Sequence, residues 1–294
     1  MKIFVTGCNG QLGRAVNQQY ANDTNVTFVN TDVADLDITK IEDVMAAVKA
    51  EKPDVIVNCA AHTAVDACET DWDNAYRINA IGPRNLSLAA NEVHAKLVHV
   101  STDYVFDGKG TRPYTEFDAT APQGAYGKTK LAGEEFVKAF ADRYFIVRTA
   151  WLYGDGKNFV KTMLRLSETN DEVRVVSDQV GSPTSTKELA SMIAHLIPTD
   201  NYGLFHGTCE GVCSWADFTE EIFRLKGLST KVNHITFKTV LNSLDLGSVI
   251  YPKYITSETI ISYVRAKQAS KDSNIEVLYH MFESQAEAIE FYVT

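Results

Sequence analysis

The sequence predicts an α/β fold in which helices cover both faces of a doubly wound parallel sheet. Two observations support this prediction: short apolar runs alternate with stretches of helical periodicity, and the first apolar run ends in a glycine-rich turn. Strands buried on both faces read as continuous apolar runs, whereas surface helices repeat their apolar residues about every 3.6 positions. The regular alternation of the two patterns indicates βαβ units, followed by a smaller C-terminal α/β lobe.

The expected strands and helices follow one another in chain order. In the first half, the expected strands are 2–6, 26–30, 54–59, 96–100 and 144–148. The expected helices begin near Leu12 and continue with 41–50, 73–93 (interrupted by Gly82-Pro83) and 127–140. In the second half, the expected elements are helix 159–167, strand 173–176, helix 187–197 and helix 215–225.

The chain is expected to contain two parts. Residues 1–150 carry the regular alternation and form the first domain, and residues 151–294 form a smaller lobe that is interleaved with the last strands of the sheet. No linker rich in Pro, Gly or Ser separates the two parts, so one compact body with a cleft is expected. From about residue 240 the sequence is poorly periodic, and this tail is expected to be atypical.

Charge and composition limit which partners and which cellular compartment are expected for this chain. The 294 residues carry a formal net charge of −10, and phosphate binding favours a basic surface, so nucleic acid is not expected as the main partner. No signal peptide precedes the first strand, and no apolar run reaches about 18 residues, so no membrane span is expected. The five cysteines, an odd number, are expected to be reduced thiols in the cytoplasm. Cys209 and Cys213 lack a second pair of metal ligands and are interpreted as structural.

The turn after the first expected strand has the form of a dinucleotide-binding loop. It reads Gly7-Cys8-Asn9-Gly10-Gln11-Leu12-Gly13 and opens the next helix. Glycines permit a tight turn and the close approach of a pyrophosphate, and the helix N-terminus offers free amide protons. Asp32 follows at the end of the second strand, where a carboxylate can accept hydrogen bonds from the adenosine ribose. Together these features predict a Rossmann-type site for a nicotinamide dinucleotide.

Asp32 bears on which dinucleotide is bound. A carboxylate at this position repels a 2′-phosphate, so NADH is favoured over NADPH. Asp35 and Asp37 are alternative occupants of the position, and Asp37-Ile38 is a candidate contact for the adenine. For these loop residues, simple solvation is an equally good interpretation.

A tyrosine and a lysine are spaced one helical turn apart. Tyr126 and Lys130 stand at positions i and i+4 of an expected helix. An ammonium group nearby stabilises a phenolate, so a tyrosine in this setting can exchange a proton with an alcohol or a carbonyl. Thr102 follows the strand 96–100, and ligands of open α/β sheets bind at the carboxyl ends of strands. Such a Tyr/Lys pair is usually a surface contact, but beside a dinucleotide loop it predicts hydride transfer.

Several further sequence strings occur in the same order as in a known protein family. They are Asn58-Cys-Ala-Ala-His-Thr-Ala-Val-Asp66, Ser101-Thr-Asp-Tyr-Val-Phe-Asp-Gly108, Tyr126-Gly-Lys-Thr-Lys130, Arg148-Thr-Ala-Trp-Leu-Tyr-Gly154 and Asp178-Gln-Val-Gly-Ser-Pro-Thr184. With the glycine loop, these strings make the chain resemble the dTDP-4-dehydrorhamnose reductase family of the extended short-chain dehydrogenase/reductase superfamily. The resemblance covers about residues 1–235.

The resemblance implies a reaction and three catalytic roles. The reaction is the NAD(P)H-dependent reduction of the C4 ketone of dTDP-4-dehydro-L-rhamnose to dTDP-L-rhamnose, in the biosynthesis of dTDP-rhamnose for polysaccharides. Tyr126 would donate the proton to the C4 oxygen. Lys130 would bind the nicotinamide ribose and lower the pKa of Tyr126, and Thr102 would polarise the carbonyl. Residues 1–150 would bind NAD(P) and residues 151–294 would bind the substrate.

The resemblance also implies which residues line the two ligands. The implied cofactor contacts, besides Asp32, Asp37, Ile38, Tyr126 and Lys130, are Gly7, Gly10, Gln11, Leu12, Gly13, Ala60, Ala61, His62, Thr63 and Asn79. The implied substrate contacts, besides Thr102 and Tyr126, are Asp103, Val105, Phe106, Trp151, Asn158 and Gln179. For three of these, other roles stay open: His62 as a backbone contact, Trp151 as a core aromatic, and Asn79 as a support for the catalytic lysine.

The chain departs from the family in two places. Some members hold magnesium at a dimer contact through glutamates, but the corresponding positions read Arg14-Ala15 and Ser185-Thr186-Lys187, so no metal site is expected. A homodimer is a further expectation that the sequence leaves open. After about residue 240, the usual Arg-Pro motif and terminal helix are not evident, and Tyr251-Pro252 is the candidate remnant. This tail is expected to weaken binding of the nucleotide sugar and to leave the cofactor site intact.

Two other functions compete with the reductase interpretation. One is a different nucleotide-sugar epimerase or reductase of the superfamily, in which Ser-Ser-x-x-Val-Tyr-Gly is more usual at the place of Ser101-Thr-Asp-Tyr-Val-Phe106. The other is a non-catalytic NAD(P)-binding regulatory subunit, like that of methionine adenosyltransferase, which resembles these reductases. The joint presence of Thr102, Tyr126 and Lys130 favours catalysis.

Overall fold

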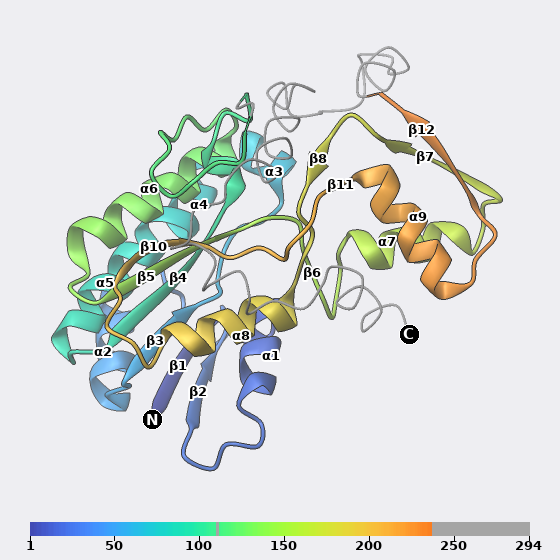
Figure 1. Cartoon of the computed structure of the whole chain (residues 1–294). Helices are drawn as coiled ribbons and strands as arrows, with labels where there is room; N and C mark the ends of the chain where they lie inside the picture. Colours follow the sequence, from blue (N-terminus) through green and yellow to red (C-terminus); the bar gives the residue numbers. More distant parts are fainter. Residues whose placement is uncertain (110–111, 237–294) are drawn as a thin grey trace. The chain divides into compact units, whose positions relative to one another are not determined.

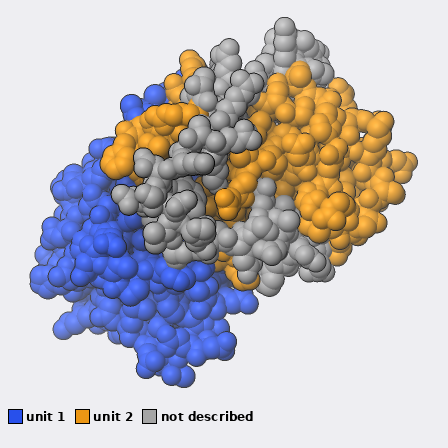
Figure 2. All heavy atoms as spheres, viewed as in Figure 1, with its two compact units in different colours: residues 1–106, 119–149, 189–207 blue, residues 107–118, 150–188, 208–294 orange. Residues whose placement is uncertain are grey.

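A six-stranded parallel sheet forms the centre of the first of two units. The computed structural model describes residues 1–109 and 112–236, so the expectations for the tail after about residue 240 lie outside the described residues. Unit 1 comprises 1–106, 119–149 and 189–207, and unit 2 comprises 107–118, 150–188 and the chain from 208 onward (Figure 2). Unit 1 therefore includes a segment, 189–207, that follows much of unit 2 in the sequence.

All neighbouring strands of the central sheet run parallel, in the order β10-β5-β4-β3-β1-β2 (Figure 1). These strands are β1 (Lys2–Thr6), β2 (Thr27–Thr31), β3 (Val55–Asn58), β4 (Lys96–Thr102), β5 (Tyr144–Thr149) and β10 (Gly203–His206). Strand β2 lies on one side of β1, whereas β3 and the later strands extend the sheet on the other side. The order therefore reverses between β1 and β3, and ligands of doubly wound sheets bind at the carboxyl ends beside such a reversal.

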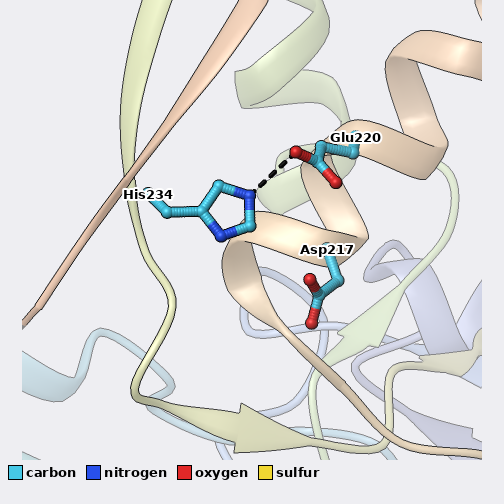
Figure 3. Close-up of side chains that lie close together, drawn as sticks. All are labelled: Asp217, Glu220 and His234. Carbon is cyan, nitrogen blue, oxygen red and sulfur yellow. Dashed lines mark hydrogen bonds and ion pairs between the residues drawn. The ribbon is translucent and has the colours of Figure 1, made fainter.

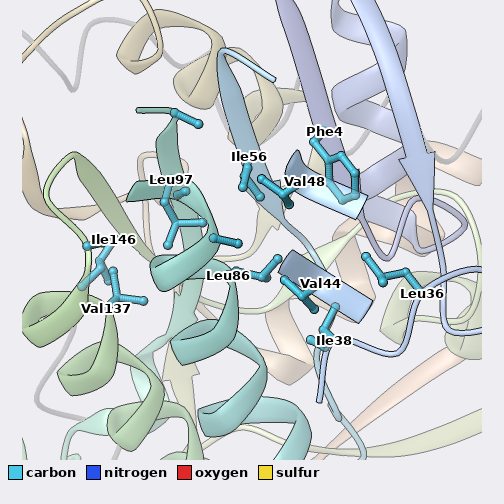
Figure 4. Close-up of a cluster of buried hydrophobic side chains, with 14 residues drawn as sticks. Phe4, Leu36, Ile38, Val44, Val48, Ile56, Leu86, Leu97, Val137 and Ile146 are labelled. Atoms are coloured by element: carbon cyan, nitrogen blue, oxygen red, sulfur yellow. The ribbon is translucent and has the colours of Figure 1, made fainter. Parts of the chain in front are cut away.

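Helices cover both faces of this sheet. They are α1 (Gln11–Gln19), α2 (Ile41–Glu51), α3 (Val65–Thr70), α4 (Trp72–Tyr76), α5 (Gly82–Glu92), α6 (Ala125–Phe140) and α8 (Thr186–Leu196). On one face, α2, α5 and α6 bury a cluster that includes Phe4, Ile56 and Leu97 of the strands (Figure 4). On the opposite face, α8 packs near Val147 of β5. The predicted doubly wound α/β fold is confirmed.

The helical stretch expected at 73–93 contains a wider turn. Helix α4 continues into a π-helical turn, η1 (Arg77–Ile81), and then into α5, which has Pro83 in its first turn. Proline has no amide proton to donate, so position 83 makes no hydrogen bond back into η1, at the point where the helix changes from π to α geometry. Helix α6 packs directly on η1, since a Cβ added to Gly133 would collide with the carbonyl oxygen of Asn79. Hydrophobic periodicity predicted the extent of this stretch but not its π-helical turn.

A buried ion pair joins α6 to the sheet. The guanidinium of Arg148 on β5 donates through Nε and Nη2 to the two carboxylate oxygens of Glu134, at 2.8 and 2.7 Å. The Ser101 hydroxyl on β4 also donates to Glu134, at 2.6 Å. Both charged side chains are buried, Glu134 completely. Because one carboxylate binds two neighbouring strands, it fixes the position of the helix relative to both.

Unit 2 consists of two-stranded ladders and two helices around an aromatic core. Its ladders pair β6 (Leu152–Tyr153) with β9 (Thr184–Ser185), β8 (Val180–Gly181) with β11 (Cys213–Ser214), and β7 (Glu172–Val176) with β12 (Lys231–Ile235). The helices are α7 (Phe159–Ser167) and α9 (Trp215–Lys226). Tyr153 and Phe218 are buried at the centre of this core. None of the helices in the described part of the chain is both long enough and apolar enough to cross a membrane.

Glu134→Gln is expected to destabilise the protein strongly, because Arg148 would stay charged and buried without a carboxylate. Breaking a buried ion pair from one side costs about 3–5 kcal/mol. Urea denaturation followed by circular dichroism measures the free energy of unfolding. The matched control is Glu135→Gln, an exposed change one position further along, which should alter that free energy by less than about 0.5 kcal/mol. Equal losses in the two variants would contradict the role given to the ion pair.

Candidate active site

The glycine loop forms a cradle at the reversal of strand order. Gly7 has a φ of +65°, and a Cβ there would lie 2.8 Å from the amide nitrogen of Ala60 after β3. A Cβ on Gly13 would lie 2.6 Å from the Cα of Cys8. Gly10 begins α1, whose first turn holds no acidic side chain. The loop thus brings the N-terminus of α1 close to the segment after β3 without a side chain in between, which fits the pyrophosphate of a dinucleotide.

Asp32 lies directly beside this cradle. Its carboxylate accepts hydrogen bonds from the amide of Asn9 in the loop, at 3.0 Å, and from the amide of Val33, at 2.8 Å. The alternative carboxylates take other positions: Asp35 accepts from the amide of Asp32, and Asp37 accepts from the amide and hydroxyl of Thr39. Of the three carboxylates, Asp32 therefore has the position that suits an adenosine ribose.

The other two residues predicted to contact the adenine, Asp37 and Ile38, are engaged in contacts within the protein. The hydrogen bonds from Thr39 lower the pKa of Asp37, so this carboxylate is ionised and engaged in a local turn. The side chain of Ile38 is buried in the core cluster, where it fills the space beside Gly82 of α5. A contact of Asp37 or Ile38 with the cofactor stays a prediction.

Buried polar side chains, joined by hydrogen bonds, connect the segment after β3 to the sheet. The carbonyl oxygen of the Asn58 side chain accepts from the Thr6 hydroxyl at 2.7 Å and from the Ala60 amide at 3.2 Å. The Asn58 amide lies 3.0 Å from Nδ1 of His99 on β4. Burial lowers the pKa of His99, so its neutral ring can accept this hydrogen bond. These side chains connect β1, β3 and β4 at the base of the segment that contains Ala60 and Ala61.

Asn79 ties the same segment to helix α6. Its side-chain oxygen accepts from the backbone amide of His62 at 2.8 Å, and its side-chain nitrogen donates to the carbonyl of His62 at 3.1 Å. The same nitrogen donates to the hydroxyl of Thr129 on α6, at 3.1 Å. Asn79 therefore links the segment that contains His62 and Thr63 to the helix that carries Lys130, and its side chain is engaged with both. The His62 ring in turn lies 3.2 Å from the thiol of Cys68 on α3.

Tyr126, Lys130 and Thr102 meet at the carboxyl end of β4. Tyr126 and Lys130 occupy successive turns of α6, and both are buried. The Lys130 ammonium donates to the carbonyl oxygen of Val100 on β4, at 2.6 Å. Thr102 ends β4 and begins a 3₁₀ turn, η2 (Asp103–Val105), and its hydroxyl acts on the Tyr126 phenol as a hydrogen-bond partner. The structure thus brings together the three residues predicted to be catalytic.

The electrostatics of the site differ from the expectation in one respect. Burial raises the pKa of Tyr126, with smaller contributions from Asp103 and Cys68, so the phenol stays protonated at neutral pH. The Thr102 hydroxyl acts in the opposite direction and lowers the pKa of Tyr126. Burial lowers the pKa of Lys130 from its usual 10.5 to about 8, opposed by the negative charge of Glu134. The arrangement therefore holds a neutral proton donor beside a lysine that can lose its proton at mildly alkaline pH.

The other predicted substrate residues of unit 1 mainly serve packing. Val105 is fully buried in η2, and the Phe106 ring lies 4.9 Å from the guanidinium carbon of Arg148. The Tyr104 ring meets the Tyr126 ring edge to face, at 5.4 Å between centroids. These contacts hold η2 against α6 and against the buried ion pair. Asp103, at the start of η2, accepts a hydrogen bond from the Thr102 hydroxyl at 3.0 Å.

The three substrate candidates of unit 2 have structural roles within that unit. Trp151 stacks on Trp215 with 3.4 Å between ring centroids, in a left-handed conformation with a φ of +48°. Asn158 begins α7 and accepts a hydrogen bond from the amide of Lys161. The backbone carbonyl of Gln179 accepts from the amide of Trp215, at 3.4 Å. Their contact with a substrate stays a prediction.

One group of side chains in unit 2 has the composition of a metal site. Atoms of Asp217, Glu220 and His234 that could act as ligands lie within 4.8 Å of one another on an exposed surface (Figure 3). Glu220 pairs with Nε2 of His234 at 2.8 Å, and Asp217 accepts from the amide and hydroxyl of Ser214 in the capping box of α9. These contacts account for the proximity of the three side chains without an ion.

Sequence reasoning missed the residues that position the catalytic ones. Glu134, Arg148 and Cys68 were not among the predicted site residues. Glu134 follows Lys130 by one further helical turn, a spacing that could have signalled a role on the same helix face. The partners of Arg148 and Cys68 are distant in the sequence, so no local pattern identifies them.

Comparisons with known proteins agree with this geometry. The family model described as the RmlD substrate binding domain matches residues 1–244. The dTDP-4-dehydrorhamnose reductase of Escherichia coli is 40% identical over 246 residues, which cover 80% of this chain and 82% of that enzyme.

Two solved structures are also similar over nearly the whole chain. A dTDP-4-dehydrorhamnose reductase from Clostridium acetobutylicum has a TM-score of 0.88 and 49% identity, covering 100% of this chain and 98% of that one. The enzyme from Bacillus anthracis, in complex with NADP, has a TM-score of 0.85 and 39% identity, with coverages of 99% and 98%. The chain therefore belongs to the RmlD substrate binding domain family, the family of the dTDP-4-dehydrorhamnose reductases.

Proposed function

We propose that this chain is an NAD(P)H-dependent oxidoreductase that reduces the C4 ketone of dTDP-4-dehydro-L-rhamnose to dTDP-L-rhamnose. The observation that carries the proposal is the convergence of Thr102, Tyr126 and Lys130 beside the glycine cradle. The names of the related enzymes support the choice of substrate. This reaction would be a step in the biosynthesis of dTDP-rhamnose.

When bound, the dinucleotide supplies the hydride that reaches the C4 carbon of the sugar. The Tyr126 phenol supplies the proton, because burial keeps it protonated until a negative charge develops on the ketone oxygen. The Thr102 hydroxyl orients the ketone by donating a hydrogen bond to its oxygen. The Lys130 ammonium, held by the Val100 carbonyl, stabilises the phenolate that Tyr126 becomes.

The cradle supports binding of either reduced dinucleotide, and Asp32 supports a preference for NADH. The relative from Bacillus anthracis was solved with NADP, so this preference is a proposal for the present chain alone. A cytoplasmic location, the absence of a nucleic-acid partner and a homodimer likewise stay predictions from the sequence.

Tyr126→Phe is expected to reduce kcat by about 10²- to 10⁴-fold, the usual contribution of a general acid. The variant keeps the ring and its packing on Tyr104 but cannot donate a proton. Oxidation of NADH and NADPH, followed by absorbance with dTDP-4-dehydro-L-rhamnose, measures the rate. Tyr144→Phe, on β5, is the control and should retain wild-type turnover. A wild-type rate no faster than that of Tyr126→Phe would favour the non-catalytic binding subunit.

Asp32→Ser is expected to shift the preference from NADH toward NADPH by roughly fivefold, since an exposed charge pair is worth about 1 kcal/mol. The measured quantity is the ratio of kcat/KM for the two dinucleotides. Asp35→Ser is the matched comparison, because Asp35 lies beside Asp32 and binds its amide. A larger shift in Asp35→Ser would assign the ribose contact to Asp35 instead.

Lys130→Met is expected to abolish most turnover and to change how stability depends on pH. The pKa of Lys130 in the folded protein, about 8, lies below its usual 10.5, so the unfolded chain binds more protons between these values. The free energy of unfolding contributed by Lys130 therefore increases as the pH rises from about 8 to 10.5, by up to about 3 kcal/mol.

The difference in urea stability between wild type and Lys130→Met, measured at pH 7 and at pH 10, isolates this contribution from that of other groups. At pH 7 the variant should be more stable in urea relative to wild type than it is at pH 10, where this advantage should be lost. Lys128→Met changes an exposed lysine of the same helix and should show no such pH dependence. A difference that is constant with pH would contradict a lowered pKa for Lys130.

A further inference from the structure

The Thr102 hydroxyl has a single proton, and Asp103 receives it. Thr102 Oγ1 donates to Oδ1 of Asp103 at 3.0 Å, and it accepts from the backbone amide of Tyr104 at 3.3 Å. Both bonds are local to the start of η2, where Thr102 is the capping residue. In this structure the hydroxyl proton therefore points toward Asp103, although the hydroxyl also neighbours the Tyr126 phenol, whose pKa it lowers.

This orientation conflicts with the proposed reaction. To orient and polarise the ketone, Thr102 must donate to the substrate oxygen, and one hydroxyl proton cannot make both hydrogen bonds. A bond to an ionised carboxylate is roughly twice as strong as one between neutral groups, so an ionised Asp103 competes effectively with a neutral ketone. Loss of the charge on Asp103 would remove this competition.

The surroundings of Asp103 favour loss of that charge. Burial raises its pKa to about 6, opposed by hydrogen bonds from Thr102 and from backbone amides of η2. Asp103 acts electrostatically on the phenols of Tyr104, on η2, and Tyr126, on α6, and raises the pKa of both. Among the described groups that set the pKa of Asp103, none is a cation that would hold the carboxylate ionised.

Two side chains of α3, Asp66 and Cys68, also act electrostatically on these tyrosines. Asp66 raises the pKa of Tyr104, and Cys68 raises the pKa of Tyr126. Neither phenol ionises near neutral pH, and the pKa of Cys68 is itself raised to about 11. Lys130, with its pKa of about 8, stays mostly protonated below that value. A transition of activity near pH 6 would therefore come from neither tyrosine, nor from Cys68 or Lys130.

We propose that Asp103 is a positioning residue that sets the direction of the Thr102 hydroxyl, turning its proton away from the substrate when ionised and releasing it when protonated. The inference rests on the proposed reduction of a sugar ketone. The protonated carboxyl can itself donate to Thr102 Oγ1, while Thr102 donates to the ketone oxygen. The hydrogen bonds of Asp103 and Thr102 then both point toward the oxygen that becomes negative, and the proton on Asp103 stays there, while the proton that Tyr126 gives to the product is replaced from solvent in each cycle.

The wild-type kcat/KM is expected to rise by about tenfold as the pH falls from 7.5 to 5, with a midpoint near 6, since one hydrogen bond of intermediate strength corresponds to about that factor. Asp103→Asn places an amide donor on Thr102 and cannot titrate. Its kcat/KM at pH 7.5 should equal that of wild type at pH 5 and should not change between these values. His62→Gln removes the imidazole that lies beside Cys68 and should keep the transition, whatever its rate.

A second measurement is independent of turnover. Infrared difference spectra of wild type minus Asp103→Asn should show a carboxyl group that takes up a proton near pH 6. In Thr102→Val, which removes a hydrogen bond that lowers the pKa of Asp103, this protonation should move to higher pH. Absence of turnover with the dTDP sugar would remove the proposed function, while the infrared titration would still test whether Thr102 and Asp103 are coupled.

Three outcomes would overturn the inference. The first is a carboxyl that stays ionised throughout pH 5 to 7.5. The second is an Asp103→Asn variant that melts like wild type but is slower at every pH, because the carboxylate would then be needed as such. The third is an Asp103→Asn variant that keeps the wild-type transition, which would assign that transition to another group.

Discussion

The position of helix α6, which carries Tyr126 and Lys130, depends on one buried carboxylate. Glu134 binds Ser101 of β4 and Arg148 of β5, and it lies one turn beyond Lys130 on α6. A charge of this kind is costly to bury unless every partner is in place, so the interaction permits only a narrow range of helix positions. Thr102 follows Ser101 directly, and the distance between the strand end and the helix is therefore set by the same contact.

Close approach of backbones supplies the rest of the positioning. A Cβ on Gly127 would collide with the carbonyl of Tyr104, and one on Gly133 would collide with that of Asn79. Helix α6 therefore contacts η2 at its beginning and η1 near its middle without a side chain in between. Gly7 has the same relation to Ala60 at the cofactor cradle. Main-chain segments touch at these glycines, so a side chain added there would displace the backbone around the site before it changed any reacting group.

The sequence was informative wherever the determining pattern is local. Apolar runs located the strands, and the glycine spacing, Asp32 and the Tyr126/Lys130 pair located residues that the fold does bring to one edge of the sheet. Two kinds of feature escaped. The partners of Glu134 and Arg148 depend on strand order, which periodicity does not encode. The direction of the pKa shift of Tyr126 depends on burial, which opposes the effect expected from a neighbouring lysine. In unit 2, short ladders of two residues leave too few positions for an alternating pattern.

The π-helical turn η1 has a consequence for how the chain tolerates insertions and deletions. A π turn accommodates one residue more than an α turn, so it is equivalent to a single-residue insertion within a continuous helix. Deleting one residue there would restore a regular α-helical turn with α4 and α5 still in phase, but it would remove the wide turn on which Asn79 lies. Asn79 would then leave either the His62 backbone or Thr129 without its partner. The register of this helix, which contributes no reacting group, is thus constrained as tightly as the identity of the residues that it supports.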